Sequence, residues 1–470
     1  MKSKSKTNHL AATPTDYSQP WITDTAWITG LTGAFAILVI GFLFGLSRLH
    51  VTGLEFIQAS AQEEKNALIL LALGAVSILM IAVELVRLAL FKGFEFICKD
   101  PLLAQGKIGA FIVDAVKRYL ALLLLFFVCR WLYFSCNEYG YIAKSSYYQP
   151  WFYVLDVLWS LFIVGGLPYV LLTRAFKYNA QADQKDLSQL TIRVLIVLGS
   201  FIPALKIPRP QFTLDDRRAA TGLAVKFFFA PVMTVFFYDN FTHLLNNSDY
   251  LASNALPKLF NGEYDHAKLA TDLGNILTNI IFTLDVGLAW CGYVISSRWL
   301  DNNTVSAEPT VLGWVVCLIS YPPFRVVGGW LLTGPGESLY TQIPNQPAVA
   351  FFGSLMMATY FLYMLPTIWF GLRFSNLTHR GIIRTGPYAF VRHPAYAAKN
   401  LAWWCVGFPT AIYAGFSEGI NQMIIYLAGL VLLTSIYYAR AITEERHLRF
   451  DPNYVEYCSR VKYRFFPGLI

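Results

Sequence analysis

Residues 348–371 read AVAFFGSLMMATYFLYMLPTIWFG, an apolar run without a single charged side chain. About 20 such residues suffice for a helix to cross the hydrocarbon core of a bilayer. Comparable runs recur along the chain, and their spacing predicts an all-α, polytopic transmembrane protein of about ten helices. We expect spanning helices near residues 27–49, 67–91, 111–134, 151–173, 223–244, 275–295, 310–332, 348–371, 401–416 and 421–440.

The overall composition agrees with membrane insertion. Hydrophobic residues make up 56% of the chain and charged residues only 14%, whereas a soluble domain carries about 25% charged residues. The run at 27–49 is too long for a signal-peptide core and lacks a small-residue cleavage site, so we interpret it as a true span. The stretch 191–205 is too short to cross and is expected to be interfacial or re-entrant.

Lysine and arginine in the connecting segments predict the orientation. They are abundant in the N-terminal tail and in 174–222, and absent from 333–347. This places the N-terminus, the segment 372–400 and the C-terminal tail in the cytoplasm, and the expected location is a bacterial inner membrane. The same bias accounts for the net charge of +8, so no nucleic-acid partner is expected and membrane lipids are the expected neighbours.

The seven cysteines include no CxxC pair and no cluster with histidine. This argues against a zinc site or a disulfide framework, and no metal is expected.

A polar segment, GPYAFVRHPAYAAKN at 386–400, interrupts the apolar pattern between two expected helices. Gly386 and Pro387 suit a turn, and Pro394 suits the first position of a helix. The N–H groups of that helix start, together with the Arg392 guanidinium, would bind a carboxylate or phosphate. The plainer interpretation is that Arg392 and Lys399 only mark the cytoplasmic edge of a membrane helix.

A second polar cluster, EERHLRF at 444–450, follows the last apolar run. Glu444 and Glu445 could simply form i,i+4 pairs with Arg440 and Arg449. A short hairpin would instead return both carboxylates to Arg392 and His393. The cytoplasmic pocket would then have a cationic and an anionic end, which suits a zwitterionic cofactor with an amino-acid part and a ribose.

Together these clusters resemble the isoprenylcysteine carboxyl methyltransferase family and its phospholipid N-methyltransferase relatives. The resemblance covers about the last quarter of the chain. It rests on His379, Gly386, Pro387, Tyr388, Arg392, His393, Pro394, Tyr396, Glu444, Glu445, Leu448, Tyr454, Tyr457 and Pro467.

The resemblance implies S-adenosylmethionine as the cofactor and a lipophilic, membrane-borne methyl acceptor. It implies a methyltransferase-like domain at 346–470, built on a helical hairpin, after a multi-pass region of unknown role at 1–345. Arg392 and Glu444 would be catalytic. The cofactor would be bound by His379, Gly386, Pro387, Tyr388, Arg392, His393, Tyr396, Glu444 and Glu445.

Other features leave alternatives open. The residues after Tyr396 depart from the small residue that the family usually has there, and the ending YCSRVKYRFFPGLI is similar to sterol-type double-bond reductases, which use NADPH. A transport or non-enzymatic role would fit the ionisable residues inside apolar runs. These are Glu84, Arg87, Asp114, Arg130, Asp156, Lys226, Asp239 and Asp285.

We expect two pairs among these residues, Glu84 with Arg87 and Arg130 with Asp156. Asp285 has no evident local partner, so it could be paired structurally, line an acceptor cavity, or serve transport.

Overall fold

The computed structural model describes residues 22–48, 62–92, 98–136, 147–177, 186–203, 206–262, 266–324, 340 and 342–469. Nearly all regular structure in these ranges is helical, as predicted. The main helices are α1 (Trp27–Arg48), α2 (Gln62–Lys92), α3 (Pro101–Ala104), α4 (Ile108–Ser135), α6 (Gln149–Ala175), α7 (Leu187–Ser200), α8 (Leu214–Tyr250), α9 (Leu256–Phe260), α10 (His266–Val294), α11 (Val311–Leu318), α14 (Gln346–Phe370), α15 (Pro394–Ser417), α16 (Ile420–Leu448) and α17 (Pro452–Arg460).

Two short antiparallel strand pairs join distant segments. β1 (Cys98–Lys99) pairs with β2 (Phe176–Lys177), and β3 (Ser306–Ala307) pairs with β4 (Thr378–His379). In the second pair Ser306 lies opposite His379, which fixes the segment before α11 against the segment after α14.

Within the described ranges, seven helical segments are long and apolar enough to cross a membrane, which supports a multi-pass integral membrane protein. They are Thr23–Phe44, Asn66–Phe91, Gln149–Ala175, Leu214–Phe260, Asp272–Val294, Gln346–Arg373 and Ile420–Leu448. The predicted helices at 111–134 and 401–416 also form, as α4 and α15, but they are not among the seven. The stretch 191–205, predicted to be too short to cross, overlaps α7, a helix of 14 residues that is not among the seven; its interfacial or re-entrant placement stays a prediction.

The predicted span at 310–332 is wrong over the part that is described. Helix α11 has only 8 residues and ends at Leu318, and turns follow as far as Phe324. Pro322 and Pro323 explain this end, because proline lacks the N–H that a helix needs and disfavours helical geometry in the residue before it. Residues 325–332 lie outside the described ranges.

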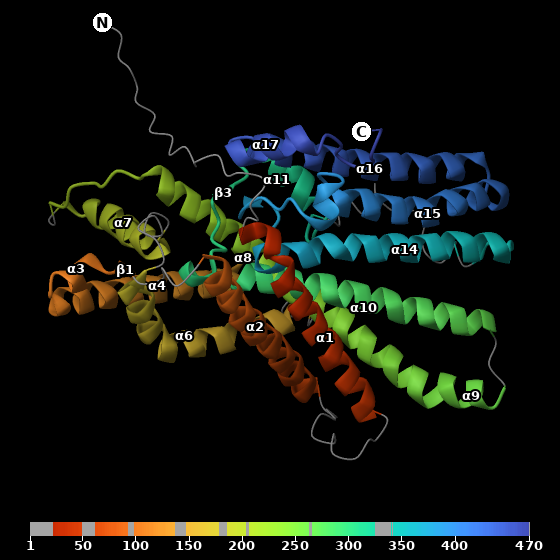
Figure 1. Ribbon diagram of the computed structural model, residues 1–470, viewed down its shortest axis with the longest axis horizontal. Coiled ribbons are helices and arrows are strands. Elements are labelled where there is room, and N and C mark those ends of the chain that lie inside the picture. Colours follow the sequence, from red (N-terminus) through yellow and green to blue (C-terminus); the bar gives the residue numbers. More distant parts are fainter. Residues whose placement is uncertain are drawn as a thin grey trace, which may run out of the picture.

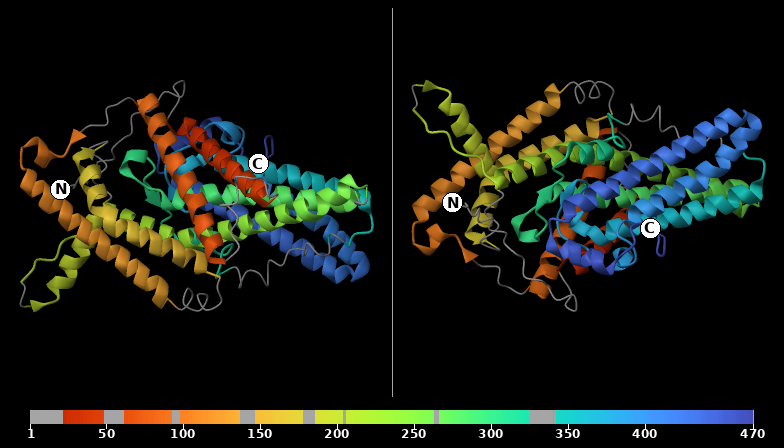
Figure 2. Two further views of the ribbon diagram at one scale, coloured as in Figure 1. Left: turned by 90° about the horizontal axis from the view of Figure 1, so that it is seen from below. Right: turned by 90° about the horizontal axis from the view of Figure 1, so that it is seen from above.

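Helices α14, α15 and α16 run side by side, with α10 along the other side of α14 (Figure 1). Helices α4, α6 and α7 gather at the opposite end of the long axis, and Figure 2 shows the same separation from two further directions. The turn between α15 and α16 contains Gly419, whose φ of 106° suits glycine. The resulting tight hairpin makes the start of α15 and the end of α16 neighbours.

Buried ion pairs connect the first two helices to the segment after α14. Arg87 Nη2 lies 2.6 Å from Glu84 Oε1, so the predicted pair forms, and Arg373 Nη1 lies 3.0 Å from the same oxygen. Arg384 donates to Asp24 just before α1, with both side chains buried. The beginning of α1 and the segment 371–393 therefore lie together.

Two further predictions about ionisable residues can be compared with the structure. Arg130 Nη2 lies 2.7 Å from Asp156 Oδ1, so that pair is confirmed. Asp285 has partners after all, because Tyr363 and Thr367 of α14 donate hydrogen bonds to its two carboxylate oxygens. These donors are distant in sequence, which is why the region around Asp285 gave no sign of them.

Candidate functional site

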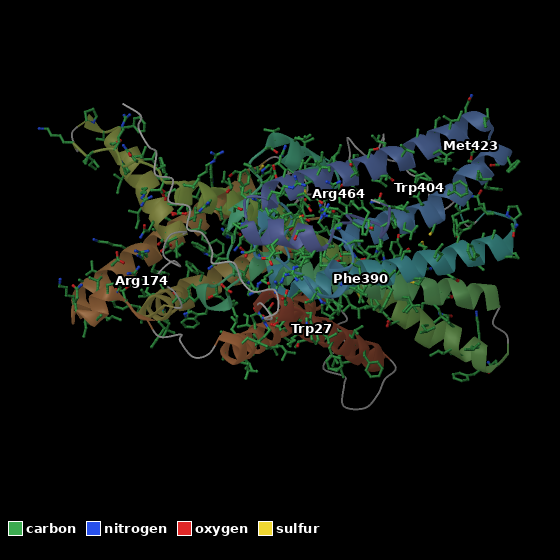
Figure 3. All side chains as sticks on the ribbon, turned by 45° about the horizontal axis from the view of Figure 1, so that its top comes forward. Trp27, Arg174, Phe390, Trp404, Met423 and Arg464 are labelled. Atoms are coloured by element: carbon green, nitrogen blue, oxygen red, sulfur yellow. The ribbon has the colours of Figure 1, made fainter. Side chains whose placement is uncertain are left out.

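A large cavity opens between the end of α14, the segment that follows it, the start of α15 and the end of α16. It holds about 1410 Å³ of empty space, part of which is open solvent. Of the predicted site residues, six line it: His379, Tyr388, Arg392, His393, Tyr396 and Glu444. Figure 3 shows Phe390 and Arg464 at this end of the helices, whereas Met423 lies at the far end, beside the hairpin turn.

Glu445 forms the wall behind the cavity. Its Oε1 atom lies 2.8 Å from Arg392 Nε, 3.3 Å from His393 Nε2 and 3.0 Å from Arg464 Nε. The residue is 2% exposed. The hairpin therefore does bring the second polar cluster back to the first, and Glu445 joins α15, α16 and the C-terminal tail.

The tail occupies part of the predicted anion site at the start of α15. The backbone N–H groups of Arg392 and His393 donate to the carbonyl oxygens of Tyr463 and Arg464, at 3.0 and 2.8 Å. The Arg392 Nη1 group donates to the carbonyl oxygens of Val461 and Lys462. Many of the N–H donors that we predicted to bind a ligand therefore bind the carbonyl oxygens of the C-terminal tail instead.

Glu444 lies on the cavity side of α16, unlike its neighbour. The Tyr396 hydroxyl donates to its Oε1 atom, and His393 Nδ1 lies 3.8 Å from its Oε2 atom. The rings of His393 and Tyr396 are stacked, with centroids 5.5 Å apart. Glu444 therefore presents a partly exposed carboxylate in a setting of hydrogen-bond donors and flat aromatic surfaces.

His379 has a defined tautomer. The N–H of Gly381 donates to Nδ1 at 3.0 Å, so Nε2 carries the proton that is shared with Asp451 Oδ2 at 2.8 Å. Burial opposes ionisation of Asp451, but hydrogen bonds from His379 and from the N–H of Asn453 hold the pKa of that carboxyl below its usual value. The pair ties β4 to the start of α17.

Gly386 and Pro387 shape the site without lining the cavity. Gly386 has a φ of 61°, and a Cβ atom there would lie 2.1 Å from ring atoms of Trp369. The turn places Tyr388 at the cavity wall, where the Tyr457 hydroxyl donates to its carbonyl oxygen. Burial raises the pKa of the Tyr388 hydroxyl well above its usual value, so it stays a neutral donor.

Several lining residues were not predicted. Arg440 packs over the rings of Tyr396 and Tyr437 and donates to Asn376, rather than pairing with Glu444. Lys399 lies over the rings of Tyr363 and Trp403. The sequence suggested that Arg440 pairs with Glu444 and that Lys399 marks a membrane edge. Both side chains line one cavity because α15 packs against both α14 and α16.

Residues before position 345 also take part. Glu308, Gly313, Cys317 and Tyr321 line the cavity, and no short motif in that region marked them. The division of the chain at 345 stays a prediction, but the wall of this cavity is built from both sides of it.

Comparisons with protein-family models, with curated proteins and with solved structures find no match for this chain.

Proposed function

We propose that this chain is an integral membrane methyltransferase that uses S-adenosylmethionine and acts on a lipophilic acceptor. The observation that carries the proposal is the meeting of Arg392, His393, Tyr396 and Glu444 at one cavity, although Tyr396 and Glu444 are 48 residues apart in the sequence. The resemblance of the last quarter of the chain supports the same activity.

The residues at the cavity fit the groups of this cofactor. Glu444 can accept hydrogen bonds from ribose hydroxyls or from an ammonium group. Tyr396 and Tyr437, whose ring centroids are 5.2 Å apart, add aromatic surface to the cavity wall beside Glu444, although Arg440 already packs over both rings. Tyr388 can donate or accept a hydrogen bond at the edge of an adenosine. His379, whose two ring nitrogens already bind Gly381 and Asp451, acts indirectly, as do Gly386, Pro387 and Glu445, by fixing the backbone around the cavity.

S-adenosylmethionine, when bound, supplies an electrophilic methyl group. The chain itself must then align an acceptor in line with that group and keep water away. Tyr363, Tyr321 and Tyr437 give the cavity an aromatic wall, which suits a lipid-borne acceptor. An acceptor that is already ionised needs no strong base, so the wall has to provide orientation and electrostatics only.

Binding of S-adenosylhomocysteine to the purified full chain in detergent micelles tests the proposal. We expect calorimetric binding to the native protein and a loss of about tenfold or more in Glu444→Gln, because a charged acceptor of hydrogen bonds is removed. Glu456→Gln is the matched control, since Glu456 lies on α17 outside the cavity and its change should leave affinity unaltered.

A second candidate function is supported by the cations at the cavity. Arg380, Lys399 and Arg440 all line it and would suit the phosphates of NADPH, as the reductase-like tail also suggests. Tight binding of NADPH without binding of S-adenosylhomocysteine would replace the methyltransferase proposal with that of a double-bond reductase.

A further inference from the structure

Arg380 is a buried cation whose hydrogen-bonding capacity is largely unused. It is 4% exposed and lines the cavity. Its Nη1 group donates to the carbonyl of Gly292, but Nε and Nη2 have no hydrogen-bond partner among the described residues. Buried donors of this kind are rare in proteins unless water or a ligand satisfies them.

The surroundings of Arg380 add positive charge. Arg373 and Lys226 both lie close enough to Arg380 for their positive charges to interact with it. Burial is the main reason why the pKa of Arg380 falls to about 10, and Arg373 lowers it further. Arg373 has Glu84 as a partner, whereas Arg380 forms no ion pair with the residues that the structure describes.

Neighbouring donors point to the same kind of ligand. The Arg373 Nε and Thr378 Oγ1 atoms are also buried and without partners in the described part of the chain, and both residues line the cavity. An oxyanion would satisfy such donors, and a guanidinium can bind one through two parallel hydrogen bonds. Burying a cation is costly when no anion accompanies it, so this part of the cavity is prepared for a negatively charged group.

We propose that Arg380 binds an oxyanion of the ligand, and that this oxyanion is the carboxylate of the amino-acid part of the cofactor. The assignment rests on the proposed function. Arg392, the residue that the sequence suggested for an anion, is the weaker candidate, because its Nε and Nη1 groups already hold Glu445 and the tail carbonyls. The carboxylate would then lie on the wall formed by residues 373–380, with Glu444 facing the other groups of the ligand.

Two ligands that differ only in this carboxylate test the assignment. S-adenosylhomocysteine and its decarboxylated analogue are titrated against the full chain in detergent, in the native protein, Arg380→Gln and Arg380→Lys. The native protein should prefer the carboxylate form by about tenfold or more, as expected for charge-assisted hydrogen bonds. Arg380→Gln should bind both ligands equally, at the affinity of the decarboxylated analogue, and Arg380→Lys should keep part of the preference.

A ligand-free measurement separates this role from a structural one. Because an uncompensated buried cation destabilises the empty protein, Arg380→Gln should melt at the same temperature as the native protein or higher. Arg460→Gln, an exposed cation on α17, is the control and should change neither melting nor ligand preference.

The other outcomes contradict either the role of Arg380, the proposed function, or the identity of the oxyanion. If Arg380→Gln keeps the native preference, or melts well below the native protein, Arg380 does not bind the carboxylate. If neither ligand binds to any variant, the proposed function fails instead. If inorganic phosphate stabilises the native protein but not Arg380→Gln, while the two ligands are bound alike by both, the oxyanion is a phosphate from another source.

Discussion

The Nε atom of Arg392 and the Oε1 atom of Glu445 lie 2.8 Å apart, although 53 residues separate them. The intervening chain is the α15–α16 hairpin, so this one contact closes it at the cavity. Oε1 also accepts a hydrogen bond from Arg464, which adds the C-terminal tail to the same junction. Glu445 therefore holds the start of α15, the end of α16 and the C-terminal tail together, whereas Glu444 faces the cavity.

Glu445→Gln should be strongly destabilising. The change removes the buried negative charge that Arg392 and Arg464 share, and breaking one partner of a buried pair costs about 3–5 kcal/mol. Thermal unfolding in detergent micelles, followed by circular dichroism, measures the effect. Glu456→Gln should shift the transition very little, because its partner Arg460 is exposed. Equal melting temperatures for Glu445→Gln and Glu456→Gln would show that the contacts of Glu445 with Arg392 and Arg464 do not stabilise the fold.

Gly386→Ala should also destabilise the protein, for a steric reason. The backbone at Gly386 has a φ of 61°, and a methyl group would collide with Trp369 at 2.1 Å. Backbone strain and overpacking each cost about 1–3 kcal/mol. The same thermal unfolding measurement applies.

The control for Gly386→Ala is Gly429→Ala. Gly429 lies within α16, and nothing lies within 4 Å of the position that a Cβ atom would take. Alanine should be neutral there, or stabilising by up to about 1 kcal/mol, because it is the better helix former. Similar losses at both glycines would mean that the turn before Tyr388 is not as tightly packed as the contact with Trp369 indicates.

The sequence predicts the helices well where one continuous apolar run decides them, as in α14 and α16. It overestimates the span at 310–332, because apolar composition there outweighed two adjacent prolines. The proximity of Arg392, His393 and the two glutamates was predictable, since a short hairpin can close in only one way. Arg380, Asn376 and Glu308 were not, because their positions at the cavity depend on the β3–β4 pairing and on packing against α10 and α11, which leave no local pattern.

The His379–Asp451 contact predicts how stability depends on pH. The pKa of Asp451 is lower in the folded chain than its usual value, which is about 3.9 for a free side chain. The ionised carboxylate therefore stabilises the folded state at pH values above about 4, and this contribution is lost as the pH falls through the lowered folded-state pKa. Asp451→Asn removes the titrating group but keeps the oxygen that caps α17 by accepting from the N–H of Asn453.

The test compares melting temperatures of the native protein and Asp451→Asn in detergent at pH 7 and at about pH 3. At pH 7 the variant should melt below the native protein, because His379 loses its charged acceptor. At the lower pH the gap should narrow, since the Asp451 carboxyl of the unfolded chain takes up a proton below its usual pKa of about 3.9 and the native protein loses part of this stabilisation. Glu456→Gln is a useful control, because Glu456 lies on α17 outside the candidate spans and its partner Arg460 is 55% exposed, so their pair should contribute little at either pH. A gap for Asp451→Asn that stays constant across this range would show that the charge of Asp451 does not stabilise the fold.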